Sequence, residues 1–162
     1  MPPYAGTEPS RAIVAKIDPS TASVEDAIIL AAYAHRGQRY PSPEREPYIL
    51  HPIRMMIEFD DPIDQMAAVL HDVVEDTDCQ DRDLAERGFP DAVVTAIEFL
   101  THRSDEDYAD YIERLCANDV ARRVKIIDLQ HNLANTRRLP ESKQTAQRVS
   151  RYEEALVRLG AI

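Results

Sequence analysis

A histidine and three carboxylates lie within six consecutive positions of the chain, His71 to Asp76. At about 100° per residue these four side chains share roughly 140° of a helix, with apolar residues on the opposite side. The pattern predicts an amphipathic helix over residues 62–76, with one core face and one acidic face. Asp72 and Asp76 repel each other at i,i+4, and acidic side chains in a last turn oppose the helix dipole. The arrangement costs stability unless a cation binds there, which makes the cluster a candidate metal site. The alternative interpretation is an ordinary amphipathic helix whose acidic face is exposed to solvent.

A second polar stripe runs through residues 125–133, with the sequence KIIDLQHNL. Lys125, Asp128 and Asn132 share one side of a helix at this spacing, and apolar residues flank them on both sides. A polar stripe between two apolar ones is expected to be buried, and buried charges are normally paired or bound to metal. A lysine–aspartate ion pair within one helix is the structural alternative to a metal site.

A third candidate is His51, which precedes Pro52 in the string PYILHP at residues 47–52. Proline disfavours helix at the residue before it and can open a new helix at its first turn. We therefore expect His51 at a rigid loop-to-helix junction that can point its imidazole inward, although a lone histidine is often structural. The combined set offers two nitrogen and two oxygen ligands, which suits a first-row divalent ion such as Mn, Fe, Co or Zn better than Ca or Mg. Its members are His51, His71, Asp72 and Asp128.

Five segments resemble, in order and spacing, the hydrolase domain of the RelA/SpoT homologue family, which belongs to the HD-domain metal-dependent phosphohydrolases. They are AHRGQR at 34–39, PYILHP at 47–52, AAVLHDVVEDT at 67–77, LT at 100–101 and KIIDLQHNL at 125–133. The match covers about residues 24–155, and HDxxED followed by KxxDxxxN is far more specific than an HD pair alone. Because the chain has no room for a synthetase or regulatory domain, it most resembles the stand-alone small alarmone hydrolases.

The resemblance implies a role for each matching residue. In the family the metal, usually Mn(II), is held at the positions of His51, His71, Asp72 and Asp128, whereas His35 does not correspond to a ligand. The pair that orients or deprotonates the attacking water corresponds to Glu75 and Asp76. Substrate contacts are implied or suggested for Arg39, Lys125, Asn132, Arg148 and Tyr152, and Lys125 could instead balance the carboxylates.

The reaction implied by the family is removal of the 3′-pyrophosphate of guanosine alarmones, which converts (p)ppGpp to GDP or GTP and pyrophosphate. A divalent ion lowers the pKa of bound water and acts as a Lewis acid on phosphoryl oxygen. A neighbouring carboxylate then takes or steers the proton. We assign the proton role to Glu75, and expect Asp76 to hold the water or to orient a ligand.

One departure from the family concerns the substrate. Tyr40 and Pro41 stand where family members commonly carry two basic residues, so that only Arg39 remains beside them, with Arg45 as a stand-in. Two further hypotheses therefore stay open. The chain could be an HD phosphohydrolase acting on another nucleotide or a phosphorylated cofactor such as NADPH, or a non-catalytic nucleotide-binding or partner-binding module of the same fold.

Length and composition predict one all-α domain. A chain of 162 residues with 44% hydrophobic content can bury a single core, and four glycines, no tryptophan and no sustained period-two pattern argue against strands. We expect a single compact HD-domain helical bundle over residues 21–162, preceded by an N-terminal tail over residues 1–20. About eight helices are predicted, at 22–36, 51–58, 62–76, 80–87, 90–101, 105–117, 119–138 and 141–159.

Charge and cysteine content restrict the partners and the compartment. A net charge of −10 argues against non-specific nucleic-acid binding, which needs a basic footprint. Two cysteines are too few for a disulfide framework, and neither a signal peptide nor a membrane-spanning run is present. We therefore expect a cytoplasmic protein whose partner is a small-molecule nucleotide rather than a nucleic acid or a membrane. Six arginines late in the chain could form a positively charged surface that binds this nucleotide, or they could simply lie on solvated helix faces. They are Arg122, Arg123, Arg137, Arg138, Arg148 and Arg151.

Overall fold

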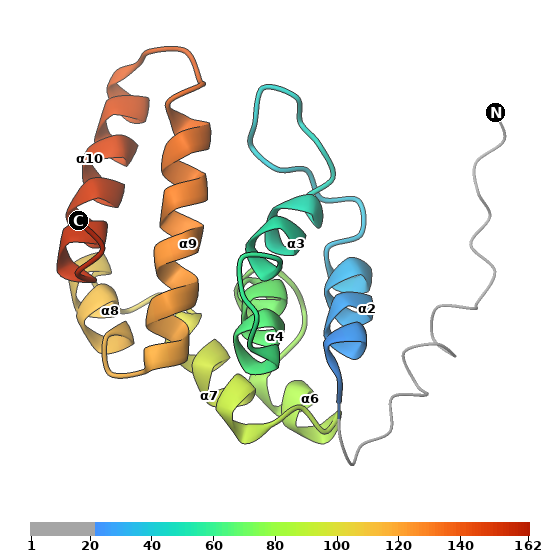
Figure 1. Ribbon diagram of the computed structural model, residues 1–162. Coiled ribbons are helices and arrows are strands. Elements are labelled where there is room, and N and C mark those ends of the chain that lie inside the picture. The colour runs from blue at the N-terminus through green and yellow to red at the C-terminus, as the bar shows by residue number, and fades with distance from the viewer. Residues whose placement is uncertain (1–21) are drawn as a thin grey trace, which may run out of the picture.

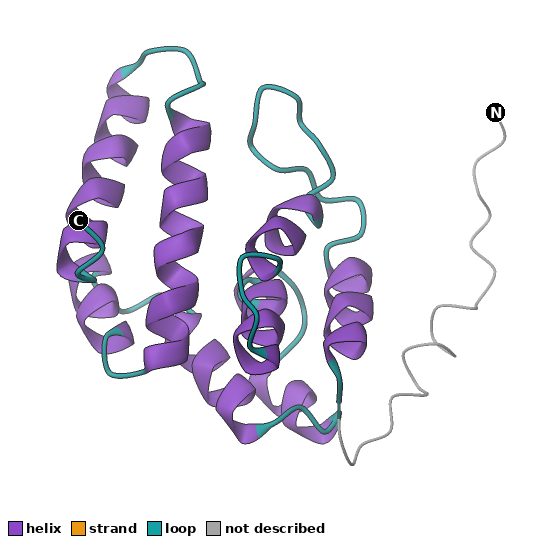
Figure 2. Ribbon diagram, viewed as in Figure 1, coloured by secondary structure: helices purple, strands orange, loops and turns teal. Residues whose placement is uncertain are grey.

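The computed structural model describes residues 22–162, so the predicted tail over residues 1–20 lies outside the described residues and its boundary remains a prediction. Within the described residues the chain consists of helices and loops (Figure 2), apart from one isolated bridge between Arg39 and Pro47. The predicted all-α fold is confirmed. The helices are α2 (Val24–Ala34), α3 (Leu50–Met56), α4 (Pro62–Leu70), α5 (Val73–Asp76), α6 (Asp81–Glu86), α7 (Asp91–Leu100), α8 (Tyr108–Leu115), α9 (Asp119–Thr136) and α10 (Lys143–Arg158).

Helix α4 forms the centre of the bundle. It packs against α2, α3, α7 and α9, and residues 66–70 are all buried. In Figure 1 the antiparallel pair α9 and α10 lies on one side, α2 lies on the other, and α6 and α7 cross one end. The last turn of α4 therefore leads the chain from the apolar core directly to the predicted metal ligands.

Local sequence signals set several helix ends. Ser23 and Asp26 form the predicted capping box at the start of α2. The Asp61 side chain accepts hydrogen bonds from the first turn of α4, and Pro62 occupies the first helical position. These caps fix where α2 and α4 begin, and thus which residues each helix presents to the core.

The predicted helix over 62–76 is wrong in one respect, because it is broken at the HD pair. Helix α4 ends at Leu70, and a separate short helix, α5, begins at Val73. Asp72 lies between them with φ −106° and ψ 1°, a sparsely populated backbone region. Glu75 and Asp76 are the last two residues of α5, whose four residues form a single turn.

An ion pair fastens α4 to α9 beneath the predicted metal ligands. The Arg123 guanidinium donates to both oxygens of the buried Asp64 carboxylate, at 2.9 and 2.7 Å. Removing the arginine would leave a buried carboxylate without its partner, which is costly.

We expect Arg123→Ala to lower the free energy of unfolding by about 1–2 kcal/mol, a value moderated by the exposure of the arginine to water. Urea denaturation followed by circular dichroism measures the change. Gln130→Ala, an exposed position on the same helix, is the matched control and should stay within about 0.5 kcal/mol of wild type. Equal stability of Arg123→Ala and this control would contradict the prediction.

Candidate metal centre

The junction between α4 and α5 brings the HD pair together. The His71 ring is buried, and its Nδ1 lies 2.8 Å from the Ala68 carbonyl oxygen. Because a carbonyl only accepts, Nδ1 carries the proton and Nε2 presents a lone pair. That Nε2 lies 2.9 Å from the Asp72 Oδ2 atom. Two acceptor atoms at this distance repel each other unless a proton or a metal ion lies between them.

The pKa values of His71 and Asp72 also indicate that a proton or a metal ion lies between the two side chains. Burial, the largest single influence, would lower the pKa of His71, but the carboxylates of Asp72 and Asp128 together raise this pKa to about 9. Burial would likewise raise the pKa of Asp72, but His71 lowers it to about 2. In the metal-free protein a proton therefore supplies the positive charge that the carboxylate requires. A divalent cation can take its place, since metal binding displaces protons from its ligands.

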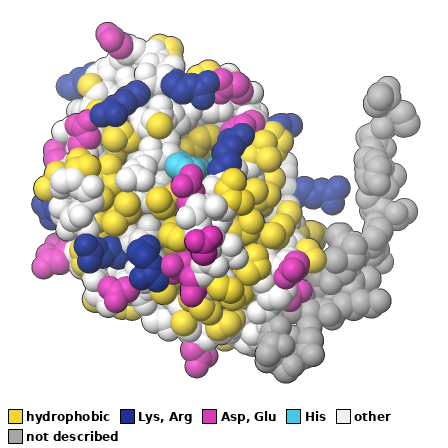
Figure 3. Space-filling model, viewed as in Figure 1, with side chains coloured by type: hydrophobic (Ala, Val, Ile, Leu, Met, Phe, Trp, Pro, Cys, Tyr) yellow, Lys and Arg dark blue, Asp and Glu magenta, His cyan; other side chains and the backbone are white. Residues whose placement is uncertain are grey.

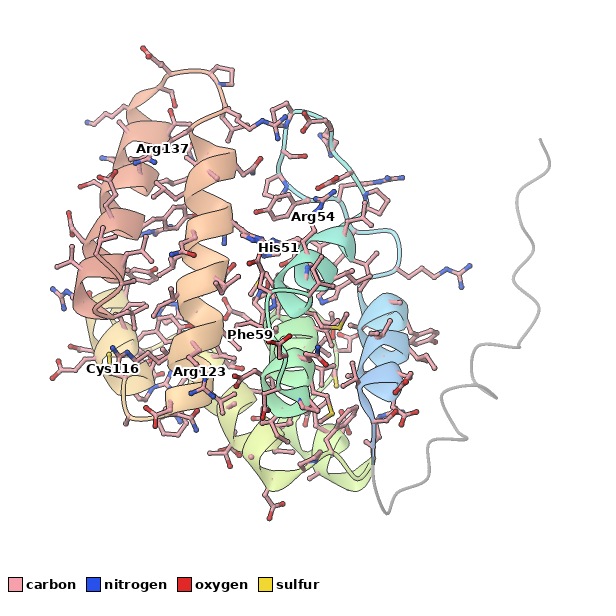
Figure 4. All side chains as sticks on the ribbon, in the orientation of Figure 1. His51, Arg54, Phe59, Cys116, Arg123 and Arg137 are labelled. Atoms are coloured by element: carbon pink, nitrogen blue, oxygen red, sulfur yellow. The ribbon has the colours of Figure 1, made fainter. Side chains whose placement is uncertain are left out.

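His51 completes a group of three candidate ligands. It is buried in the first turn of α3, at the predicted junction before Pro52, and Figure 4 shows it between α3 and α9. Ligand atoms of His51, His71 and Asp72 all lie within 4.8 Å of one another. Two imidazole nitrogens and a carboxylate oxygen converging from two chain segments are a donor set that suits a first-row divalent ion.

The fourth predicted ligand, Asp128, lies beside the two histidines. Its Oδ1 atom is 3.2 Å from His51 Nε2 and 3.8 Å from His71 Nε2. The predicted polar stripe of α9 is present, because Lys125 Nζ donates to Asp128 Oδ2 at 2.9 Å and Asn132 Nδ2 donates to Asp128 Oδ1 at 2.6 Å. Burial would raise the pKa of Asp128, but Lys125 and the histidines hold it well below its ordinary value. The ion pair offered as the structural alternative therefore exists within the candidate metal centre.

A tyrosine hydroxyl contacts one candidate ligand from the loop between α2 and α3. Tyr48 donates to Asp72, and its ring lies 4.7 Å from the ring of the buried His35. His35 in turn bonds Gln38 through Nδ1, and it is not a member of the group of candidate ligands. Tyr48 stands in the recognised PYILHP string but was not among the predicted site residues. The HP pair that follows it is the local signal for this position.

The two carboxylates of α5 lie beside the centre and are exposed. Glu75 accepts a hydrogen bond from the backbone N–H of His102, at 3.0 Å. Burial raises the pKa of Asp76, and the neighbouring carboxylates of Asp72 and Glu75 raise it further. Both side chains remain accessible to solvent while one of them is held by a backbone donor, an arrangement that suits proton transfer from water.

The loop that presents His102 is held by Arg114 of α8. The guanidinium donates to the carbonyl oxygens of Phe99 and Thr101, at 3.3 and 3.0 Å, and to both carboxylate oxygens of Glu106, at 2.6 and 2.7 Å. A backbone donor carries no side-chain signature, so sequence patterns could not have indicated it.

This ion pair makes stability depend on pH. Hydrogen bonding to Arg114 lowers the pKa of Glu106 to about 2, from an ordinary value of 4.5. The stabilisation is thus fully present above pH 4.5 and is lost as the pH falls towards 2. We expect Glu106→Gln to be less stable than wild type at neutral pH, and the difference to close over this range. Urea unfolding at several pH values measures it, with Glu113→Gln as control, and a difference that is constant with pH would refute it.

The predicted substrate contacts are only partly gathered at the centre. Lys125 and Asn132 contact Asp128 directly, as described above. Arg39 is exposed, and in the described part of the chain no hydrogen bond or ion pair joins it to the centre. The same holds for Arg148, which is half-buried on α10. Tyr152 is half-buried on the same helix, with the Arg151 guanidinium 5.6 Å from its ring.

The late arginines do not form a uniform positively charged surface. Three of them bind acidic side chains: Arg123 binds Asp64, Arg137 binds Glu153, and Arg138 binds Glu44. Arg122 donates to the Leu159 carbonyl oxygen instead, and the Arg151 guanidinium lies over the rings of Tyr108 and Tyr152. Among residues 22–162, Arg122, Arg148 and Arg151 are thus without a carboxylate partner.

A cavity of about 270 Å³ lies beside His51, lined in part by Tyr40, Arg54 and His131. Figure 4 shows Arg54 near His51. On the face shown in Figure 3, a histidine is visible in a hollow, next to a basic and an acidic side chain. Of the four candidate ligands, His51 is the one that lines this cavity. No helix in the described part of the chain has the length and apolar character that crossing a bilayer requires.

No family model matches the chain, but individual relatives do. Guanosine-3′,5′-bis(diphosphate) 3′-pyrophosphohydrolase MESH1 of Danio rerio is 32% identical over 151 residues, which cover 83% of this chain and 81% of that protein. The Homo sapiens protein of the same name is 33% identical over 147 residues, covering 82% and 80%.

A solved structure described as a metazoan orthologue of SpoT that hydrolyses ppGpp shares the fold. It has a TM-score of 0.65 and 24% identity, and the match covers 86% of this chain and 96% of that one. The sequence motifs, the geometry of the HD centre and the relatives lead to the same conclusion. The chain belongs to the MESH1 family of guanosine-3′,5′-bis(diphosphate) 3′-pyrophosphohydrolases.

Proposed function

We propose that the chain removes the 3′-pyrophosphate of guanosine alarmones, converting ppGpp to GDP and pppGpp to GTP. The names of the relatives support this substrate. The observation that carries the chemistry is the close approach of His71 Nε2 and Asp72 Oδ2, a pair that holds a proton in the metal-free protein and can exchange it for a metal cation. His51 and Asp128 meet the pair there from two further helices.

We further propose that this cation is a divalent metal, Mn(II) or another first-row ion, held by His51, His71, Asp72 and Asp128. When bound, such an ion supplies Lewis acidity and a lowered pKa for water. Lys125 balances the carboxylate charge of Asp128 rather than reaching for phosphate, because its ammonium group is already bound there.

The transfer of a proton from the attacking water is assigned to the carboxylates of α5. Glu75 takes the proton of the attacking water, and its hydrogen bond from the His102 backbone fixes its orientation. Asp76, whose pKa is raised, holds the water or steers the ligand Asp72 one turn away. The water oxygen bonds to the phosphorus attached at the 3′ oxygen, and the bond between that phosphorus and the 3′ oxygen breaks. Glu75 then passes the proton that it took from the water to the leaving 3′ oxygen of the nucleotide. The other product is pyrophosphate.

The substrate is proposed to lie between the metal centre and α10. Arg148 is free to bind phosphate, and Tyr152 offers a half-buried ring for the nucleoside. Arg39 can meet the nucleotide only from the exposed loop. A cytoplasmic location is part of the proposal, because Cys79 and Cys116 are both free thiols.

A second candidate function is phosphate hydrolysis on another nucleotide or a phosphorylated cofactor. The observation that favours it is the side chain at position 40. The basic residue that the family resemblance leads one to expect there is replaced by a buried tyrosine.

A substrate panel separates the two functions. The purified chain is incubated with Mn(II) and, separately, ppGpp, pppGpp and NADPH, and pyrophosphate and orthophosphate are quantified. We expect pyrophosphate in one-to-one ratio with GDP or GTP. Orthophosphate from NADPH without pyrophosphate from the alarmones would favour the second function. The absence of metal-dependent release from every compound would refute both.

A further inference from the structure

Tyr40 links two candidate metal ligands of different helices, His51 by direct stacking and Asp128 through Asn132. It lies in the loop between α2 and α3, and only 6% of its surface is exposed. Its ring stacks on the His51 imidazole, with centroids 4.6 Å apart and an angle of 18° between the planes. Its hydroxyl donates to Asn132 Oδ1 at 2.7 Å. Asn132 in turn donates to Asp128 Oδ1, which lies 3.2 Å from His51 Nε2. These contacts close a ring through one ligand of α3 and one of α9.

The hydroxyl is a permanent donor in this ring. Burial raises the pKa of Tyr40 above its ordinary value, and the carboxylate of Asp128 adds to the shift. The hydroxyl therefore keeps its proton at neutral pH. Asn132 is then oriented by both of its neighbours, with its oxygen facing Tyr40 and its nitrogen facing Asp128. An amide held in this way positions the carboxylate of Asp128.

The loop holds Tyr40 firmly in this position. The Tyr40 backbone N–H donates to Glu46 O at 3.0 Å, and its carbonyl accepts from Ser42 at 2.8 Å. Asn135 of α9 donates to Pro41 O at 3.0 Å. Glu46 also pairs with Arg54 of α3, so that the loop is attached to both helices. The tyrosine is therefore held in a fixed position between α3 and α9 and can link the two helices.

From these contacts we infer that Tyr40 is a positioning residue for the metal centre, which sets His51 directly and Asp128 through Asn132. This inference rests on the proposed metal centre but not on the identity of the substrate. Residues that orient metal ligands commonly contribute 10–100-fold, roughly, to metal affinity. Compared with a basic residue at position 40, the tyrosine would thus lose a contact to the substrate and would hold the metal ligands in a better defined geometry.

The test compares Co(II) and Mn(II) binding to the full chain and its variants, in the absence of substrate. Tyr40→Phe keeps the stacking and loses the hydroxyl, so we expect Co(II) affinity to fall roughly five-fold, as for the loss of one hydrogen bond, with a changed Co(II) visible spectrum. Tyr40→Leu also loses the stacking and should bind about 10–100-fold more weakly. Tyr33→Phe, which removes the hydroxyl of an exposed tyrosine on α2, is the matched control and should bind like wild type.

Two further measurements separate this role from a general structural one. In an Asn132→Ala background, Tyr40→Phe should cause no additional loss of Co(II) affinity, because the hydroxyl acts through Asn132. Excess Mn(II) should restore most of the hydrolytic activity of Tyr40→Phe. Unchanged affinity and an unchanged spectrum for Tyr40→Phe would overturn the inference while leaving the proposed function intact. If wild type bound neither ion, the proposed metal centre would be wrong, and this inference with it.

Discussion

Replacement of Asp72 by alanine is expected to remove the bound metal and to lower the rate of hydrolysis at least about 1,000-fold, because the charge stabilisation supplied by a metal ion is worth several kcal/mol. Asp72 provides the carboxylate that faces His71 Nε2. Without it, the centre loses the charge that draws a cation to the end of α4.

Metal content after dialysis, measured by mass spectrometry, and the rate with added Mn(II) together test this expectation. Asp78→Ala, an exposed acidic residue just beyond α5, is the control and should keep its metal. The metal-free form of Asp72→Ala should remain folded, since His71 can adopt its neutral form when the carboxylate is gone. A variant that retained a full equivalent of metal would contradict the role given to Asp72.

Replacement of Glu75 by glutamine is expected to lower the rate about 10²–10⁴-fold while leaving metal content unchanged, because only the proton acceptor is lost. Glutamine has the same shape, and its amide oxygen can still accept the hydrogen bond from the His102 N–H. The change therefore separates proton transfer from positioning.

Rate and metal content are measured on the same preparation, and Asp76→Asn serves as the comparison. If Asp76 only holds the water or steers Asp72, its replacement should cost less than that of Glu75. An unchanged rate in Glu75→Gln would show that another group takes the proton. A loss of metal in this variant would show that Glu75 belongs to the ligand set.

Periodic patterns in the sequence predicted most of the fold. The helices predicted over 90–101, 119–138 and 141–159 correspond to α7, α9 and α10, with ends that differ by only a few residues. The polar stripe of Lys125, Asp128 and Asn132 was predictable because all three residues lie in one regular helix. Helical spacing alone was sufficient to place them on the same side.

The break at His71 and Asp72 was not predictable from periodicity. The apolar stripe continues through Val73 and Val74, and so the pattern indicated one helix. The structure places α5 separately, as a single turn that still ends at Asp76. The electrostatic cost of the acidic cluster was recognised in the sequence, but the change of backbone at Asp72 was not.

The features of the site that the sequence did not predict depend on contacts between distant segments. Tyr40 and Asn132 are 92 positions apart, and no local pattern relates them. The sequence did indicate that position 40 differs from the family, but only as the loss of a basic group. The stacking on His51 depends on the path of the whole loop between α2 and α3. Such a contact requires the tertiary structure.

The most direct test of the proposed reaction is to follow the oxygen atom that enters the products from water. The chain is incubated with ppGpp and Mn(II) in ¹⁸O-labelled water, and the products are analysed by mass spectrometry. We predict one ¹⁸O atom in the released pyrophosphate and none in GDP, because the water attacks the phosphorus attached at the 3′ oxygen. Label in GDP, or orthophosphate as the first product, would contradict the proposed reaction.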